Sequence, residues 1–161
     1  MKSPLATYLH DHLAGATYAL DLVQALRDHY KGQPLGELAS QLHTEIAADK
    51  DTLEGIAESF GPAPDFIKNT AAWLSEKVSR LKLDHSKPTG LGTFEALEFL
   101  ALGIHGKRAM WRALAEISGD EPALTDVDFA SLIVRAENQE RLVEEQRLIA
   151  AHRTLDSSLR E

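Results

Sequence analysis

The segment that decides the fold is LGELASQLHTEIAADKDTLEGIAESFGPAP, residues 35–64 of this 161-residue chain. Its apolar residues recur every three, four or seven positions, which places them on one face of an α-helix. They are Leu35, Leu38, Leu42, Ile46, Leu53, Ile56 and Phe60. Glycine and proline interrupt helices, so the closing Gly61-Pro62-Ala63-Pro64 ends the pattern. The segment therefore predicts a long amphipathic helix over about residues 35–60.

Four other segments show the same helical period, and glycine or proline separates them. These helices are expected over about residues 4–32, 65–83, 93–119 and 125–153. Ser3 is the expected side-chain N-cap of the first helix, and Thr125–Asp128 resembles a capping box that opens the last. Residues 1–153 then form one domain, and residues 154–161 form a frayed tail.

The lengths and connections of these helices predict the fold class. The first two helices and the last two are long, and each pair is joined by a short turn, which favours antiparallel hairpins. The shorter helix over residues 65–83 lies between the hairpins and carries the chain from one end to the other. We therefore predict an all-α, up-and-down four-helix bundle with a short crossover helix.

Composition and charge exclude several classes of function. The chain has 25 acidic and 17 basic residues, a net charge of −8, and no basic run, which argues against nucleic-acid binding. It has no cysteine, and so no disulfides, thiolate metal sites or thiol nucleophiles. No apolar run approaches the roughly 18 residues of a membrane span, and no signal peptide is visible. We expect a soluble, cytoplasmic protein without membrane partners.

Several polar residues lie on or beside the apolar faces of the predicted helices. Two carboxylates one turn apart, Glu45 and Asp49, point at the apolar stripe of the second helix. Glu98 and His105 lie on a narrow polar stripe of the helix over 93–119, and Glu140 lies in the middle of the last apolar face. Their estimated heights in the bundle agree to within about two turns. We expect these five side chains to approach one another in the interior.

Buried carboxylates need a cation, a proton or several hydrogen bonds, and three interpretations supply these. The first is a salt-bridge network with Arg108, Arg112 and Arg147, which also point inward. The second is a metal centre, for which carboxylates and imidazole suit iron, manganese or zinc. The third is acid–base catalysis without a metal.

A histidine and several small residues suggest a different kind of site in the first helix. His12 interrupts the apolar seam and is followed by Gly15, Ala16 and Ala19. It is either a hydrogen-bonded core histidine or part of a ligand cavity, which would lie near His12 and Trp111. The other histidines of the first two helices fall off the seams and are expected on the surface: His10, His29 and His43.

The helix over residues 93–119 is apolar around most of its circumference. Gly103 and Gly106 lower its helix propensity, so we expect close approach of another helix there. A bundle hides one face of each helix well, and the surplus apolar surface favours a homodimer.

The paired long helices, the crossover and the inward carboxylates resemble the ferritin-like superfamily over about residues 4–153. In that superfamily two helices each supply a Glu and two others each supply a Glu-x-x-His pair, which together hold two metal ions. Here the matching positions carry Glu45 with Asp49, Glu98 with His105 seven residues on, and Glu140 without a histidine. The resemblance implies a metal-binding bundle. The alternative is a non-enzymatic dimeric structural or small-molecule-binding module in which buried salt bridges replace an ancestral metal site.

Overall fold

The computed structural model describes residues 3–62, Glu76 and residues 90–156. These residues form four long α-helices and one short 3-10 turn: α1 (Pro4–His29), α2 (Pro34–Glu58), α4 (Leu91–Ile117), η1 (Pro122–Leu124) and α5 (Phe129–Leu155). The described part of the chain contains no strand, so the predicted all-α class is confirmed. None of the described helices is both long enough and apolar enough to cross a bilayer.

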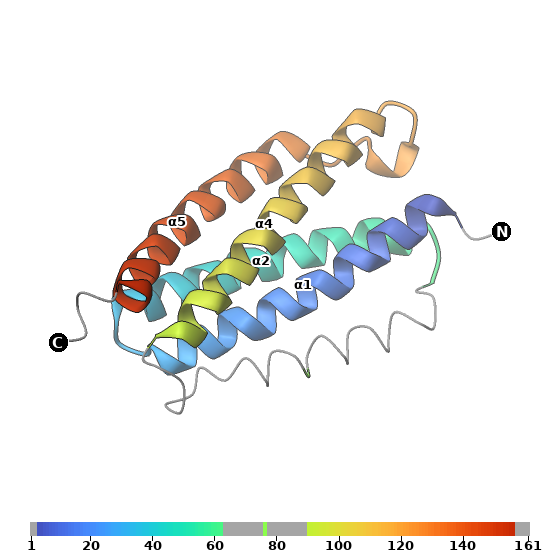
Figure 1. The fold of residues 1–161 in the computed structure, drawn as a ribbon. Helices are drawn as coiled ribbons and strands as arrows, with labels where there is room; N and C mark the ends of the chain where they lie inside the picture. The colour runs from blue at the N-terminus through green and yellow to red at the C-terminus, as the bar shows by residue number, and fades with distance from the viewer. Residues whose placement is uncertain (1–2, 63–75, 77–89, 157–161) are drawn as a thin grey trace.

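The helices pair as two antiparallel hairpins, α1 with α2 and α4 with α5 (Figure 1). Helix α1 also packs beside α4, and α2 approaches α5. Helix α2 ends at one end of the bundle and α4 begins at the other (Figure 1). The helix predicted over residues 65–83 lies outside the described residues, apart from Glu76, which is helical.

The structure corrects two of the predicted helix caps. Ser3 occupies the N-cap position of α1, but its side chain makes no cap hydrogen bond. The expected capping box is wrong, because α5 begins only after Asp128. The carboxylate of Asp128 accepts from the backbone N–H of Ser131 at 3.0 Å and from its hydroxyl at 2.6 Å. Residues 122–124 instead form the 3-10 turn.

The end of α5 packs against the start of α4. The helix continues to Leu155, two residues beyond the predicted end, and Thr154 is buried. Gly90 has a φ of +93°, and a Cβ added there would lie 2.7 Å from Oγ1 of Thr154. This contact requires glycine at residue 90, because an L side chain is strained at that φ and would also collide.

Two apolar clusters form the core, one toward each end of the bundle. Leu22, Leu97 and Leu100 belong to the first cluster, and Leu53 and Trp111 belong to the second. In both α2 and α4 the boundary between the clusters falls in the middle of the helix, where charged side chains interrupt the buried stripe.

One expected surface residue is part of the core. His10 is buried, and its Nε2 lies 3.1 Å from the backbone carbonyl of Gly61, just beyond α2. The prediction failed because the seam of α1 was taken as its whole buried face. The turn after α2 covers an adjacent position as well.

Candidate functional site

A layer of polar side chains from α2, α4 and α5 separates the two apolar clusters. Lys107 donates to Oδ2 of Asp49 and to Oε1 of Gln139, the latter at 2.5 Å. Gln139 in turn donates from Nε2 to Oε2 of Glu45 at 2.9 Å. On the other side Nη2 of Arg135 forms an ion pair with Oδ1 of Asp49 at 2.6 Å. We call these five residues the polar layer.

The centre of the polar layer is buried, and the charges of the layer balance. The side chain of Asp49 is 2 % exposed and that of Lys107 is 14 % exposed. Burial lowers the pKa of Lys107, and the neighbouring charge of Asp49 only partly opposes that shift. Two carboxylates thus face two cations, Lys107 and Arg135, and Gln139 bridges them. Such a layer already supplies the compensation for which a metal ion was one candidate.

A second group of charged residues lies nearer the surface, between α4 and α5. Nδ1 of His105 lies 3.0 Å from Oε1 of Glu140, and Nε of Arg108 lies 3.3 Å from Oε2 of the same carboxylate. The side chain of His105 is 58 % exposed. Glu98 forms a separate ion pair with Arg147 at 3.8 Å. These are surface pairs, in which water screens the charges.

The five predicted site residues therefore do not meet at one point. Glu45 and Asp49 belong to the polar layer, His105 and Glu140 form a surface pair, and Glu98 pairs elsewhere. No group of three or more acidic or histidine residues in the described part of the chain could hold a metal ion. The geometry gives metal binding by these residues no support.

The predicted salt-bridge network exists, but its cations are different. Arg108 pairs with Glu140, Arg147 pairs with Glu98, and Arg112 is exposed. Lys107 and Arg135 hold Asp49 instead. The reason is the geometry of the helix. One residue along an α-helix turns a side chain by about 100°, so Lys107 and its neighbour Arg108 point in different directions.

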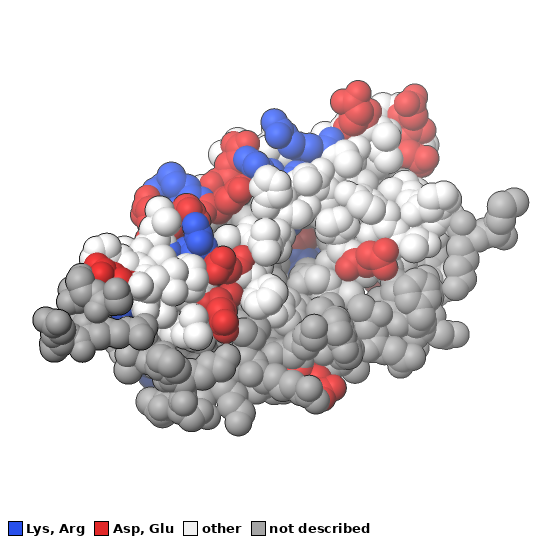
Figure 2. Space-filling view, viewed as in Figure 1, with Lys and Arg blue, Asp and Glu red and all other residues white. Residues whose placement is uncertain are grey.

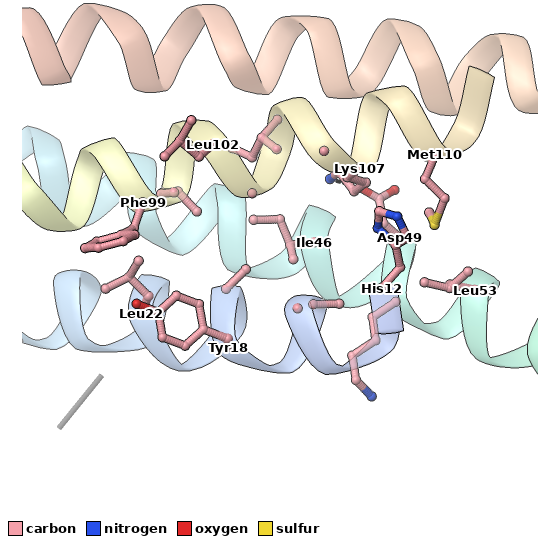
Figure 3. Close-up of a pocket in the computed structure, with 18 of the residues that line it drawn as sticks. His12, Tyr18, Leu22, Ile46, Asp49, Leu53, Phe99, Leu102, Lys107 and Met110 are labelled. Atoms are coloured by element: carbon pink, nitrogen blue, oxygen red, sulfur yellow. Dashed lines mark hydrogen bonds and ion pairs between the residues drawn. The ribbon is translucent and has the colours of Figure 1, made fainter. Parts of the chain in front are cut away.

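A cavity of about 480 Å³ lies between α1, α2 and α4, beside the polar layer (Figure 3). Both residues predicted to contact a ligand, His12 and Trp111, line it. The described lining is mainly apolar, with Asp49 and Lys107 among its polar members. The apolar members besides alanine, glycine and tryptophan are Tyr18, Leu22, Ile46, Leu53, Phe99, Leu100, Leu102, Ile104 and Met110.

Glycines keep the walls of this cavity open. Gly15 of α1 and Gly103 and Gly106 of α4 line it, and a Cβ added at any of them would meet no atom of the described residues within 4 Å. The described helices therefore do not make the close approach predicted at Gly103 and Gly106. These glycines border empty space instead.

His12 is the half-buried histidine on the cavity wall. Burial lowers its pKa, and the charge of Asp11 opposes that shift only in part. Its ring contacts Tyr8 edge-on, with 4.7 Å between ring centroids, and no described residue forms a hydrogen bond with it. A neutral imidazole offers one donor and one acceptor, so His12 can bond to a molecule in the cavity.

The cavity opens on a surface with few charges. Figure 2 shows a hollow between α1 and α4 among uncharged atoms, with acidic and basic atoms at its bottom. Phe99 and Leu102 of α4 line the cavity and are 48 % and 69 % exposed. The apolar surface of α4 is thus only partly buried.

Comparison with protein-family models, with curated proteins and with solved structures finds no match to this chain. Functional inference therefore depends on the geometry of the polar layer and the cavity.

Proposed function

We propose that this protein binds a small apolar molecule in the cavity between α1, α2 and α4. The observation that carries the proposal is the cavity itself, about 480 Å³ in volume and lined mainly by apolar side chains. Ligand sites are typically about 300–1,000 Å³ and combine apolar walls with a few polar groups. The polar residues His12, Asp49 and Lys107 fit that description.

The glycines on the cavity wall support a ligand rather than a packing defect. A glycine inside a helix costs about 1 kcal/mol relative to alanine. Gly15, Gly103 and Gly106 lie inside α1 and α4, at positions where a side chain would meet no obstacle. Selection for stability alone would favour side chains at these positions, so the open space is consistent with a role in binding.

The proposed role of the polar layer is structural. It ties α2, α4 and α5 together at mid-height and forms the floor of the cavity. A ferritin-like origin, with salt bridges in place of an ancestral metal site, is part of this proposal. It is supported by the two hairpins and by the long connection between α2 and α4.

The test is binding of a neutral environment-sensitive dye, a naphthalene ketone, followed by its fluorescence. Gly103→Leu and Gly106→Leu place side chains in the cavity and should weaken binding at least about ten-fold. Gly55→Leu is the matched control, because Gly55 also lies inside a helix with open space around it but does not line the cavity. An unbound dye, or equal binding by Gly103→Leu and Gly55→Leu, would contradict the proposal.

We also propose the homodimer that the sequence predicts. The exposure of Phe99 and Leu102 supports it, since large exposed apolar side chains on one face favour association. Leu102→Asp should shift sedimentation at micromolar concentration toward the 17.7 kDa monomer. If the unmodified chain sediments only as a monomer, the dimer is wrong, and ligand binding remains to be judged by the dye.

A further inference from the structure

We infer that the ligand of this cavity is uncharged, an apolar molecule carrying one hydroxyl or carbonyl group whose oxygen meets His12. The inference rests on the proposed function and narrows it to a chemical class. It follows from how the charges around the cavity are paired, from the unbonded ring of His12 and from the separation of polar and apolar groups along the cavity.

The charges at the cavity floor are already compensated within the protein. Asp49 contacts Lys107 and Arg135, and Gln139 links Lys107 to Glu45. An anion at Lys107 would compete with Asp49 for the ammonium charge, and a cation at Asp49 would compete with Lys107 and Arg135. Either ion would also lose its hydration on entering an apolar cavity.

The charged groups at the rim of the cavity do not favour an ionic ligand either. Lys50 pairs with Glu54, one turn along α2. Asp11 is exposed, so water screens its charge from the interior of the cavity. A neutral molecule enters without disturbing any of these pairs.

His12 supplies the hydrogen bond that a neutral ligand can use. The groups that face it are Asp11 on its own helix, Asp49 and Lys50 on α2, and Lys107 on α4. No described residue bonds to its ring, and burial favours its uncharged form. An uncharged imidazole donates to a carbonyl oxygen and accepts from a hydroxyl group, which sets the two allowed head groups.

The cavity is amphipathic along its length (Figure 3). His12, Asp49 and Lys107 lie at one end, and Tyr18 and Phe99 lie at the other, where the lining is apolar. A ligand with one oxygen at the first end and a hydrocarbon body at the second matches both surfaces. At the second end Tyr18 contributes a hydroxyl group, but none of the residues placed there is charged, so a charged ligand group would lack a counter-charge.

The test uses four competitors of one shape to displace the bound naphthalene dye at about pH 7.5. They are naphthalene, 2-naphthol, 2-naphthoate and 2-naphthylmethylammonium, which differ only in the substituent. We expect 2-naphthol to bind about five-fold more tightly than naphthalene, the effect of one net hydrogen bond. Both ions should bind more weakly than naphthalene.

Substitution of His12 separates hydrogen bonding from packing. His12→Ala should lower the affinity for 2-naphthol to that for naphthalene, about five-fold, and leave the affinity for naphthalene unchanged. His12→Gln, which keeps a donor and an acceptor, should restore the preference. His29→Ala is the control, since His29 is exposed at the far end of α1 and does not line the cavity.

The outcomes distinguish this inference from the proposed function. If naphthalene binds but 2-naphthoate or 2-naphthylmethylammonium binds as tightly as 2-naphthol, the ligand class is wrong and the cavity is still a binding site. If His12→Ala lowers the affinities for naphthalene and 2-naphthol equally, His12 only packs against the ligand, and its hydrogen bond to the ligand oxygen is wrong. If neither naphthalene nor the dye binds, the proposed function itself is wrong.

Discussion

Replacing Asp49 by alanine removes the carboxylate that contacts both Lys107 and Arg135. The side chain of Asp49 is 2 % exposed, and that of Lys107 is 14 % exposed, so the variant leaves a buried ammonium group without its counter-charge. Losing one partner of a buried ion pair costs about 3–5 kcal/mol. The pair with Arg135 adds little, because that side chain is 36 % exposed and water can replace its partner.

The structure ranks three single substitutions. Asp49→Ala should lower the free energy of unfolding by about 3–5 kcal/mol. Lys107→Met should cost less, about 2 kcal/mol, because Arg135 still neutralises Asp49. Arg108→Ala removes contacts with Glu140, Glu137 and His105, all between partly exposed side chains, and should cost below about 1 kcal/mol.

The assay is equilibrium unfolding in urea, with the midpoint and the slope fitted separately. A domain of this size has about 5–15 kcal/mol of stability, so at the lower end of that range Asp49→Ala is largely unfolded without urea. The double variant Asp49→Leu, Lys107→Met covers that case, because it leaves without a partner only Arg135, whose side chain is 36 % exposed. It should be more stable than Asp49→Ala alone. Equal losses of unfolding free energy in Asp49→Ala and Arg108→Ala would refute the reasoning. So would a double variant whose loss equals the sum of the losses from its two single substitutions.

Three single substitutions test other parts of the molecule. Burial lowers the pKa of His12, so the unfolded chain takes up the proton first, and unfolding free energy should fall as the pH drops below about 6.5. His12→Gln should flatten this profile of urea midpoints. Gly90→Ala should cost about 1–3 kcal/mol through its φ of +93° and the contact with Thr154, and more than Gly61→Ala, where φ is also positive but space is open. His105→Ala should leave the metal content unchanged in protein expressed with iron, manganese and zinc, measured by elemental analysis; a stoichiometric metal lost in this variant would restore the predicted metal centre.

Much of the fold can be predicted from the sequence because its determinants are local. The apolar period and the glycine and proline breaks define the long helices, and short turns force neighbouring helices to run antiparallel. The start of α5 was placed too early because Thr125 and Asp128 are both good caps. The contact that decides between them is the hydrogen bond that the backbone N–H of Ser131 donates to Asp128, and Pro122 already directs the preceding residues into a turn.

The candidate site was harder to predict because it depends on which residue of a turn lies on the seam. In α4 the buried seam runs through Ile104, Lys107 and Trp111, spaced three and four apart, and His105 lies one residue off it. In α5 the seam position is Gln139, which is fully buried, and Glu140 is its neighbour. A strict search for polar residues at three–four spacing would have found Lys107 and Gln139. No such rule gives the heights at which helices from separate hairpins meet.

The position of the cavity follows from how α1 is attached to the rest of the bundle. Near one end Tyr30 bonds to Thr93 at 2.5 Å, and near the other His10 contacts the carbonyl of Gly61 at 3.1 Å. Between residues 11 and 20, no side chain of α1 bonds to another helix in the described structure. The other three helices are tied at that height by the polar layer, whereas α1 presents small residues and the unbonded ring of His12 there.

A ligand in this space would supply the contact that α1 lacks. Its body would fill the gap between α1 and α4, and its oxygen would engage His12 beside the polar layer. Binding to the folded chain alone raises stability by RT ln(1 + [L]/Kd), about 2.7 kcal/mol at a hundred-fold excess over Kd. A neutral ligand should therefore raise the melting temperature of the protein. Because the gain in stability requires space between the helices, the same ligand should leave the melting temperature of Gly103→Leu unchanged.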